Sequence, residues 1–392
     1  MSRTVGVLKE TFPGERCVAI VPRSVEVLKK ADMTVLVEPS AGAAAGYTDD
    51  QYTARGATLA SRSEILAKAD IIAQFRSLGA NPEAGRPDLA QFRKGQIVLG
   101  LGEPLTALKE GADVAATGVS FFALELIPRT TRAQSMDVLS SLATISGYEA
   151  VLLGATSLPK LFPMLMTAAG TVTPAKVFVI GAGVAGLQAI ATAKRLGAVV
   201  SAYDVRSAVK DQIVSVGAKF ISLEVEAGAS EDKGGYAKAM DEAFYKRQRE
   251  LMLEVIKEQD IVISTAAVPG KRAPILITKE MVEAMAPGSV IVDVAAVRGG
   301  NCELTKLGET VMHNGVTVLG TTNFASLAAY HASQMFSANV VTFLKHLAGF
   351  LPLDKIPEDD IVSDTLVTHA GDVVNARIRE GLGLALAEGK VS

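Results

Sequence analysis

The sequence predicts an α/β protein of two domains, each built on a doubly wound parallel sheet. Its 392 residues are more than one ordinary domain needs. Apolar residues make up 49% of the chain but aromatic residues only 5%, so most apolar side chains are aliphatic. Strand-like and helix-like segments also alternate along the chain. Aliphatic strands buried under Ala-rich helices are typical of parallel sheets covered on both faces.

The first 130 residues alternate in this way from the start. Runs of β-branched and aliphatic residues predict strands at 5–8, 34–38, 70–75, 96–100 and 119–125. Amphipathic patterns predict helices at 22–30 and 61–69. A longer helix is expected over 131–153, where Thr131 and Gln134 have the spacing of a capping box.

The alternation continues in the second half. Strands are expected at 176–180, 199–204, 219–223, 261–264, 290–293 and 316–319. Helices are expected after residue 183 up to 196, and at 207–215, 239–257 and 325–347. The last helix is long enough to return to the first domain. We therefore expect one domain from 1–137 with 329–392, and the other from 138–328.

Composition excludes several classes of protein. The 39 Lys and Arg nearly balance the 42 Asp and Glu, which argues against nucleic-acid binding. Two distant cysteines and four scattered histidines predict neither a metal site nor a disulfide framework. The N-terminus lacks the apolar core of a signal peptide, and the most apolar stretch, 177–193, contains a glycine turn. We expect a cytoplasmic chain that does not itself cross a membrane.

A glycine motif gives the most specific functional signal. Gly181, Gly183 and Gly186 follow the strand-like Val177–Ile180 and open a helix. In a Rossmann-type site the first glycine permits a tight turn, the second lets the backbone approach a pyrophosphate, and the third packs helix on strand. Asp204 ends the next strand, 23 residues after Gly181, where a carboxylate binds ribose hydroxyls and favours NAD over NADP. Arg206 nearby would soften that preference, and a Rossmann domain that has lost its ligand is the alternative.

A polar segment, 128–141, interrupts two apolar stretches. One interpretation is a helix N-terminus, in which Thr131 and Gln134 form the cap. That interpretation does not require Arg129, Arg132 and Asp137. The other interpretation is a loop that contacts a ligand, and the pattern alone leaves both open.

The chain resembles the NAD(H)-binding subunits of the proton-translocating NAD(P) transhydrogenases, a branch of the alanine dehydrogenase/transhydrogenase family. The matching stretches are 132–137, 139–141, 166–172, 183–198, 234–238 and 287–291. The resemblance implies two Rossmann-like domains with an NAD-binding cleft between them, and a homodimer. It also implies that NADP(H) is held on a partner subunit and that hydride transfer is coupled to proton movement through a membrane-embedded subunit. The chain would then dock on the cytoplasmic face of the inner membrane.

The same resemblance assigns residues to roles. Arg129, Gln134 and Asp137 would be catalytic, and Gln134 would position the nicotinamide ring. The cofactor-binding set would be Arg129, Thr130, Thr131, Arg132, Gln134, Asp137, Val138, Leu139, Ser140, Gly181, Gly183, Val184, Gly186, Asp204, Val205, Arg206, Gly235, Gln248, Thr265, Ala266 and Ala267. Within this set, Asp204, Val205 and Arg206 would hold the adenosine end. Gly235 would lie on a loop that closes over the nucleotide.

Departures from the family's dehydrogenases favour the transhydrogenase branch. Alanine dehydrogenases carry a Lys, a His and an Arg for their oxo-acid substrate. Here Gln74, Leu101 and Cys17 stand at those positions, although Arg16 adjoins Cys17. Reduction of an oxo acid needs a proton donor, which Gln and Leu cannot supply. An NAD-dependent alanine-type dehydrogenase remains the main alternative, and a non-enzymatic NAD-binding sensor is a further one.

Overall fold

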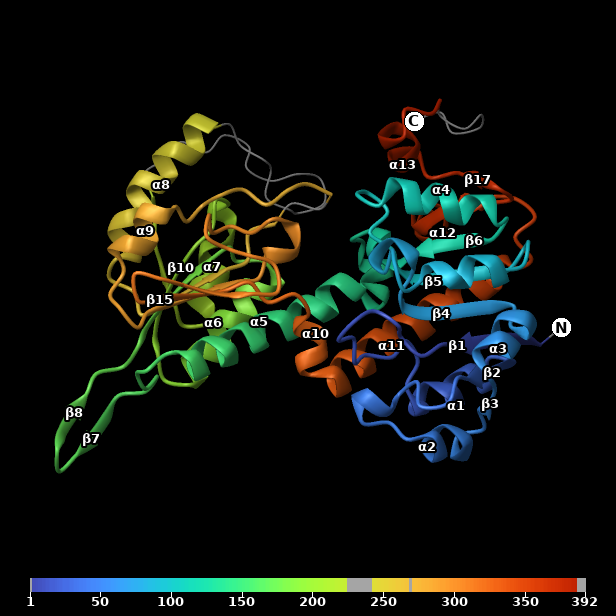
Figure 1. Ribbon diagram of the computed structural model, residues 1–392, viewed down its shortest axis with the longest axis horizontal. Helices are drawn as coiled ribbons and strands as arrows, with labels where there is room; N and C mark the ends of the chain where they lie inside the picture. The colour runs from blue at the N-terminus through green and yellow to red at the C-terminus, as the bar shows by residue number, and fades with distance from the viewer. Residues whose placement is uncertain (1, 224–241, 268–269, 386–392) are drawn as a thin grey trace. The chain divides into compact units, whose positions relative to one another are not determined.

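The computed structural model describes residues 2–223, 242–267 and 270–385. The chain divides into two compact units, of which the first comprises residues 1–142 and 325–392 and the second residues 143–324 (Figure 1). Each unit has its own sheet and its own hydrophobic core, so each is described by itself.

The sheet of the first unit has eight strands in the order β17-β16-β6-β5-β4-β1-β2-β3. Strands β1 to β6 are parallel, and their order 3-2-1-4-5-6 is that of a Rossmann sheet. Strands β16 and β17 extend it in antiparallel fashion beyond β6. The bounds are β1 Arg3–Val7, β2 Met33–Val37, β3 Thr58–Leu59, β4 Ile71–Arg76, β5 Ile97–Leu101, β6 Ser120–Ala123, β16 Leu366–His369 and β17 Asp372–Val373.

Helices cover both faces of this sheet. Neighbouring strand residues point to opposite faces, so Phe121 joins the core under α3 and α4, whereas Phe122 contacts Phe343 of α11, with ring centroids 5.5 Å apart. The sheet is therefore doubly wound, as predicted. The helices are α1 Pro22–Lys30, α2 Asp49–Ala54, α3 Arg62–Lys68, α4 Leu108–Ala116, α11 Ala329–Leu347, α12 Asp360–Thr365 and α13 Ala376–Gly381.

Serines near the end of the chain attach the loop after β1 to α10 (Phe324–Leu327) and α11. Three of them accept hydrogen bonds from backbone N–H groups at 2.8–3.0 Å: Ser326 from Arg16, Ser333 from Val18 and Ser337 from Val21. A buried backbone N–H without a partner costs about as much as a lost hydrogen bond. The C-terminal segment is thus an integral part of the first unit.

The second unit repeats the architecture. Its seven strands have the order β11-β10-β9-β12-β13-β15-β14, and only β14 at the edge is antiparallel. The strands are β9 Lys176–Ile180, β10 Val199–Tyr203, β11 Lys219–Phe220, β12 Ile261–Ser264, β13 Val290–Asp293, β14 Thr310–His313 and β15 Val316–Leu319. The helices are α5 Val138–Ser157, which begins in the first unit, α6 Val184–Arg195, α7 Lys210–Ser215, α8 Glu242–Ile256 and α9 Lys279–Ala284.

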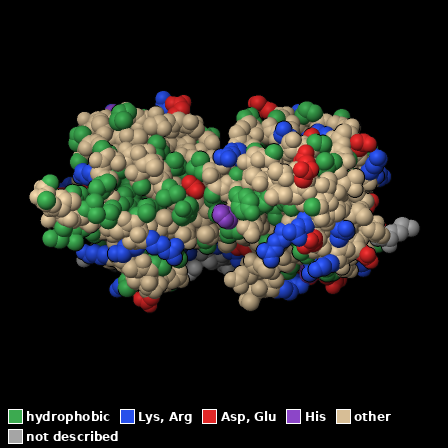
Figure 2. Space-filling model, turned by 90° about the horizontal axis from the view of Figure 1, so that it is seen from below, with side chains coloured by type: hydrophobic (Ala, Val, Ile, Leu, Met, Phe, Trp, Pro, Cys, Tyr) green, Lys and Arg blue, Asp and Glu red, His purple; other side chains and the backbone are tan. Residues whose placement is uncertain are grey.

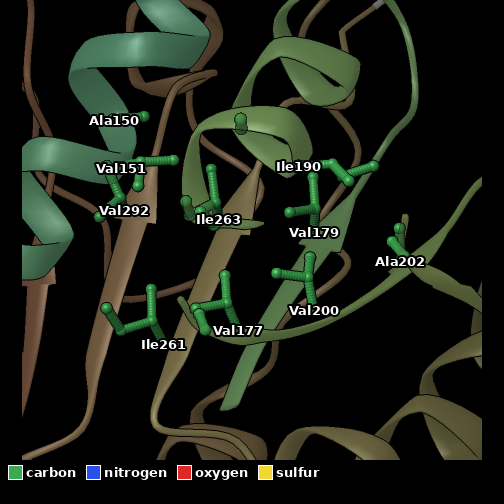
Figure 3. Packing of buried hydrophobic residues seen from close by; sticks show 14 of the residues in the cluster. Ala150, Val151, Val177, Val179, Ile190, Val200, Ala202, Ile261, Ile263 and Val292 are labelled. Atoms are coloured by element: carbon green, nitrogen blue, oxygen red, sulfur yellow. The ribbon is translucent and has the colours of Figure 1, made fainter. Parts of the chain in front are cut away.

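The core of the second unit follows the alternation of its strands. Val177 and Val179 point to the face that α5 and α6 cover, and Ile263 packs beside them (Figure 3). Phe178 and Ile180 point to the other face, under α8 and α9. Each of these side chains is at most 1% exposed, and burial of such a side chain stabilises the fold by about 1.5–3 kcal/mol. The α/β class with two Rossmann-like doubly wound sheets is confirmed.

Several predicted elements differ in detail. The helix expected at 325–347 breaks at Ala328, whose φ and ψ are −116° and 46°, into α10 and α11. The strand expected at 219–223 is only two residues long. The connection 159–173 contains a hairpin that was not predicted, formed by β7 Leu165–Thr167 and β8 Gly170–Val172. Its strands lack the regular alternation that marks a half-buried strand.

One helix in the described part of the chain, α5, is long and apolar enough to cross a membrane by length and composition alone. Ala150 and Val151 of this helix are fully buried in the core of the second unit. Core helices of globular proteins meet the same criterion.

Candidate dinucleotide site

The glycine turn of the second unit joins β9 to α6. Gly181 has a φ of +94°, a left-handed conformation that glycine adopts without strain. A Cβ at Gly186 would overlap the carbonyl oxygen of Gly181. Gly183 differs, because its φ is −75° and a Cβ there would meet no described atom within 4 Å. The turn therefore leaves open space at the N-terminus of α6, where helices bind anions.

The acidic partner lies against this turn. Asp204 follows β10 and is buried, and its Oδ2 accepts a hydrogen bond of 2.7 Å from the backbone N–H of Ala182. Arg206 donates to the same carboxylate through its backbone N–H, Nε and Nη2, at 2.8–3.0 Å. Val205, between them, is half-buried. The structure thus brings together Gly181, Gly183, Val184, Gly186, Asp204, Val205 and Arg206 at the carboxyl ends of β9 and β10.

The segment after β12 borders the turn on its other side. The backbone N–H of Thr265 donates to the carbonyl of Ile180 at 2.8 Å, and its hydroxyl donates to the carbonyl of Gly181 at 3.2 Å. Ala266 is half-buried and Ala267 exposed. These three residues adjoin the glycine turn, as the resemblance implied for cofactor-binding residues.

Two further residues of the expected pocket are placed differently. Gln248 of α8 is only 2% exposed, and its Nε2 donates to the Tyr203 hydroxyl at 2.8 Å. Tyr203 ends β10 directly before Asp204, so Gln248 supports that strand end. Gly235 lies outside the described residues.

The polar segment of the first unit is a short 3₁₀ turn, η5 Thr131–Met136, followed by α5. Asp137 separates the two with extended φ and ψ of −71° and 93°. The predicted capping box of Thr131 and Gln134 is wrong, because no side chain caps η5. Asp137 caps α5 instead, accepting from the Ser140 backbone N–H at 2.9 Å and from its hydroxyl at 2.6 Å.

The exposure of this segment agrees with a ligand-contacting loop. Arg129, Thr130 and Gln134 are exposed, whereas Ala133 and Met136 are buried and anchor the turn. The other residues of the expected set differ in exposure: Thr131 and Arg132 are exposed, Asp137, Leu139 and Ser140 half-buried, and Val138 buried.

Side chains from distant segments hold η5 in place. Asn339 of α11 donates from Nδ2 to the Ser135 carbonyl at 2.8 Å. Arg132 pairs with Asp359 at 2.6 Å and with Asp360, at the N-terminus of α12. Sequence reasoning did not find these partners, which lie more than 200 residues away. Arg132 therefore has a fixed structural role whether or not it also contacts a ligand.

Glu125 fixes the start of the same segment. Its Oε1 accepts from the backbone N–H groups of Gly102 and Glu103, at 2.8 and 2.6 Å, just after β5. Its Oε2 is buried and has no partner among the described residues. Burial, with the nearby charge of Glu103, raises the pKa of Glu125 from 4.5 to about 7.

This raised pKa gives a pH-dependent prediction. Between about pH 4.5 and 7 the folded state holds a proton that the unfolded carboxyl releases, so stability contributed by Glu125 falls as the pH rises through that range. Glu125→Gln keeps an acceptor oxygen and removes the titration. We expect the variant to gain stability relative to wild type from pH 4.5 to pH 7, by about 1.4 kcal/mol for each pKa unit of the shift.

Urea denaturation of both proteins at each pH measures this difference. Glu10, whose pKa burial raises to about 8, contributes equally to both, so the comparison isolates Glu125. A stability difference that does not change with pH would show that the Glu125 carboxyl is not protonated in the folded state.

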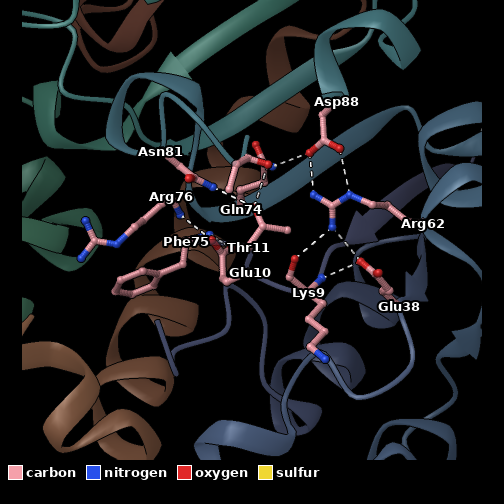
Figure 4. A network of polar contacts seen from close by, with 11 residues as sticks. Lys9, Glu10, Thr11, Glu38, Arg62, Gln74, Phe75, Arg76, Asn81 and Asp88 are labelled. Carbon is pink, nitrogen blue, oxygen red and sulfur yellow. Dashed lines mark hydrogen bonds and ion pairs between the residues drawn. The ribbon is translucent and has the colours of Figure 1, made fainter. Parts of the chain in front are cut away.

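The positions that differ from the dehydrogenases lie in the first unit. Gln74 of β4 is buried, and its Nε2 lies 3.4 Å from Oδ2 of Asp88 (Figure 4). Cys17 is 1% exposed, and burial raises the pKa of its thiol far above the usual range. Leu101 is half-buried at the end of β5. None of these three side chains is a proton donor at neutral pH.

Arg62 is the centre of the network around Gln74. Its guanidinium binds Asp88 through two hydrogen bonds of 2.8 and 2.5 Å, and it also binds Glu38 at 2.9 Å (Figure 4). Asp88 is 3% exposed. Removal of one member of a buried ion pair leaves an uncompensated charge, so Arg62→Met is expected to destabilise the protein by about 3 kcal/mol.

Chemical denaturation with Arg55→Met as the matched control checks this value. Arg55 pairs with Glu26 on the surface, where both side chains are more than 40% exposed, and we expect no measurable change there. Equal losses in the two variants would contradict a buried, stabilising role for Arg62.

Two sheets in Rossmann order, with an acidic residue against the glycine turn of the second, define an NAD-binding α/β protein of the dehydrogenase class. The chain belongs to the alanine dehydrogenase/PNT family. The model of the family's N-terminal domain matches residues 6–146, and that of its C-terminal domain matches residues 150–376.

Individual relatives place the chain nearer to one branch of this family. It is 46% identical over 375 residues to the first of the two-part alpha subunit chains of the NAD(P) transhydrogenase of Rhodospirillum rubrum, covering 95% of this chain and 97% of that protein. The crystal structure of a transhydrogenase from Sinorhizobium meliloti matches with a TM-score of 0.84 at 42% identity, covering 95% of this chain and all of the other. An alanine dehydrogenase of Methanococcus maripaludis is 31% identical and covers 76% of this chain and 74% of that protein.

Proposed function

We propose that this protein is the NAD(H)-binding subunit of a proton-translocating NAD(P) transhydrogenase. It would pass hydride between NADH and NADP⁺ held on a partner subunit. The observation that carries the proposal is the similarity, over 95% of the chain, to a transhydrogenase subunit, together with a glycine turn that has open space at Gly183.

The site residues of the second unit suit a dinucleotide. The Cβ position at Gly183 is unfilled, so a pyrophosphate can reach the backbone N–H groups at the start of α6. Asp204 would bind the adenosine ribose, and the segment Thr265–Ala267 would border the nicotinamide half. Ribose hydroxyls would share the Asp204 carboxylate with Arg206, which already donates to both of its oxygens.

The residues of the first unit suit hydride transfer without proton transfer. Bound NADH supplies the hydride, and a second nicotinamide can accept it without an acid. Such transfer requires two rings held at about 3–3.5 Å with water excluded. Gln134 and Arg129 are exposed on η5 and its approach and would orient the ring, and Asp137 would fix η5 relative to α5 through Ser140.

The alternative is an alanine-type dehydrogenase, and the surroundings of Gln74 count against it. The Gln74 amide contacts Asp88, which is already bound to Arg62. Cys17 is buried beneath the loop after β1 and cannot reach a carboxylate substrate. Neither residue offers the acid that reduction of an imine or oxo acid requires.

We further propose a homodimer. The hairpin β7–β8 projects from the second unit (Figure 1), and all six of its strand residues are exposed. Hydrophobic side chains gather on this side of the molecule (Figure 2), and those in and beside the hairpin are Leu161, Met164, Leu165, Met166 and Val172, at 38–80% exposure. A lone hairpin is marginally stable in water, and an exposed apolar patch of this kind marks a protein interface.

The remaining partners would be the membrane-embedded and NADP-binding subunits. Docking to them would place this chain at the cytoplasmic face of the inner membrane. A pull-down with those subunits in detergent tests this arrangement.

Stopped-flow measurement of hydride transfer tests the function. The chain would be mixed with the NADP-binding portion of its partner, NADH and an NADP⁺ analogue. Rapid reduction of the analogue, dependent on both proteins, is expected. Tight NADH binding with no reduction of the analogue, and NADH-dependent turnover of pyruvate with ammonia, would instead establish the dehydrogenase.

A further inference from the structure

A buried hydrogen-bond network joins the carboxyl ends of β12 and β13 in the second unit, with Asn301 at its centre. Asn301 is 0% exposed. Its Oδ1 accepts from the Ser264 hydroxyl at 2.5 Å and from the Ala266 backbone N–H at 3.1 Å. Its Nδ2 donates to the carbonyls of Ala266 and Pro274, at 2.8 and 2.9 Å. An asparagine amide has two donors and two acceptor lone pairs, and all four are used.

The amide holds the backbone of Ala266 as a neighbouring strand would. It pairs with both the N–H and the C=O of this one residue, at a point where the chain has already left β12. Thr265, directly before, is bound to Ile180 and Gly181 of the glycine turn. The segment Thr265–Ala266 is therefore fixed on one side to the turn and on the other to Asn301.

Asn301 is itself delivered by a purpose-shaped turn. Asp293 ends β13, is fully buried, and accepts from the backbone N–H groups of Asn301 and Cys302 at 2.7 and 3.0 Å. Gly299 and Gly300 precede Asn301 with φ of +94° and +82°. A Cβ at Gly300 would lie 2.8 Å from Oδ2 of Asp293, so a larger residue there would push the turn away from Asp293.

The sheet order shows which part of a dinucleotide this segment borders. Strands β10 and β12 lie on opposite sides of β9, and this reversal of strand order is where doubly wound sheets bind nucleotides. Asp204 follows β10, on the adenosine side. The segment after β12 therefore borders the other half of the molecule, which carries the nicotinamide.

We propose that Asn301 is a positioning residue that sets the backbone of Thr265–Ala267 for the nicotinamide half of NAD(H). The inference rests on the proposed function, because it requires that the second unit bind NAD(H). Its effect passes through Ala266, so it should change the affinity for NADH and leave the affinity for the adenosine half alone.

The test compares binding of NADH and of AMP to the full chain by calorimetry. Asn301→Asp keeps the size of the side chain but places a carboxylate oxygen against two carbonyls, which displaces the segment. We expect the NADH Kd to rise about tenfold and the AMP Kd to stay within twofold. Ser264→Ala removes only one donor to Asn301 and should raise the NADH Kd about threefold, so it decides the matter if the first variant does not fold.

Asn375→Asp is the matched control. This asparagine is buried in the first unit, donates to the carbonyl of Asp364 and caps α13, and its substitution should change neither Kd. Equal loss of NADH and AMP binding, or unchanged NADH binding in a folded Ser264→Ala variant, would overturn the proposed role. Failure of wild type to bind NADH would overturn the proposed function itself.

Discussion

Gln134→Asn is expected to slow hydride transfer about 100-fold while changing NADH affinity and folding little. The substitution keeps the amide but shortens the side chain by one methylene. Gln134 is exposed on η5, and its side chain makes no hydrogen bond described in the structure, so the fold does not depend on its length. Misplacement of a reacting group by about 1 Å can cost about 100-fold in rate. The expected loss is therefore in the rate of the chemical step and not in binding.

The measurement is single-turnover reduction of an NADP⁺ analogue, with NADH binding followed in parallel. Gln334→Asn, the same change at an exposed position of α11, is the control and should react at the wild-type rate. A Gln134→Asn variant that reacts as fast as wild type would remove Gln134 from the catalytic set. A variant that loses NADH binding would give it a binding role instead.

The fold could be predicted from the sequence because its signals are local. Val177–Ile180, the glycine turn and the helix that follows lie within 20 residues, and each segment predicts its own structure. Breaks inside helices were not predicted. The chain from 131 to 153 has a continuous helical pattern, yet Asp137 is extended because its carboxylate caps α5 through Ser140. A capping residue is visible in the sequence only when the start of its helix is known.

The two units also show that sheet order alone does not define a nucleotide site. Both sheets have the order 3-2-1-4-5-6. After β9 the chain makes a glycine turn, but after β1 it continues with Glu10, whose buried carboxylate accepts from the backbone N–H groups of Phe75 and Arg76 at 2.6 and 3.1 Å. A carboxylate at this position would repel a phosphate. Function therefore follows the side chains at the carboxyl edge and not the topology.

Residues that support the candidate site escaped sequence reasoning because their partners are distant in the chain. Asn301 and Asn339 are ordinary asparagines in the sequence, and their amides act on segments 35 and 204 residues away. The one local signal at Asn301 is the pair of glycines before it, which marks a turn that needs a left-handed backbone. Such a signal predicts the shape of the turn but not what its side chain binds.

Two glycines three residues apart offer the clearest separation of binding from folding. Gly183→Ala introduces a methyl group where no described atom lies within 4 Å, at a backbone conformation that alanine adopts freely. The folded protein should keep its stability. A bound pyrophosphate would need that space to reach the N-terminus of α6, and loss of one or two hydrogen bonds to a charged group costs about 1.5–3 kcal/mol each. We expect NADH affinity to fall on the order of 100-fold.

Gly186→Ala should do the opposite. Its methyl group would overlap the Gly181 carbonyl oxygen and approach the Thr265 hydroxyl at 3.2 Å, so α6 must move away from β9. Overpacking of this kind costs about 1–3 kcal/mol of stability. Thermal denaturation and NADH titration of both variants distinguish the two effects. If Gly183→Ala bound NADH like wild type, the space above Gly183 would not be the phosphate site, and the nucleotide would have to lie elsewhere along the carboxyl edge of the sheet.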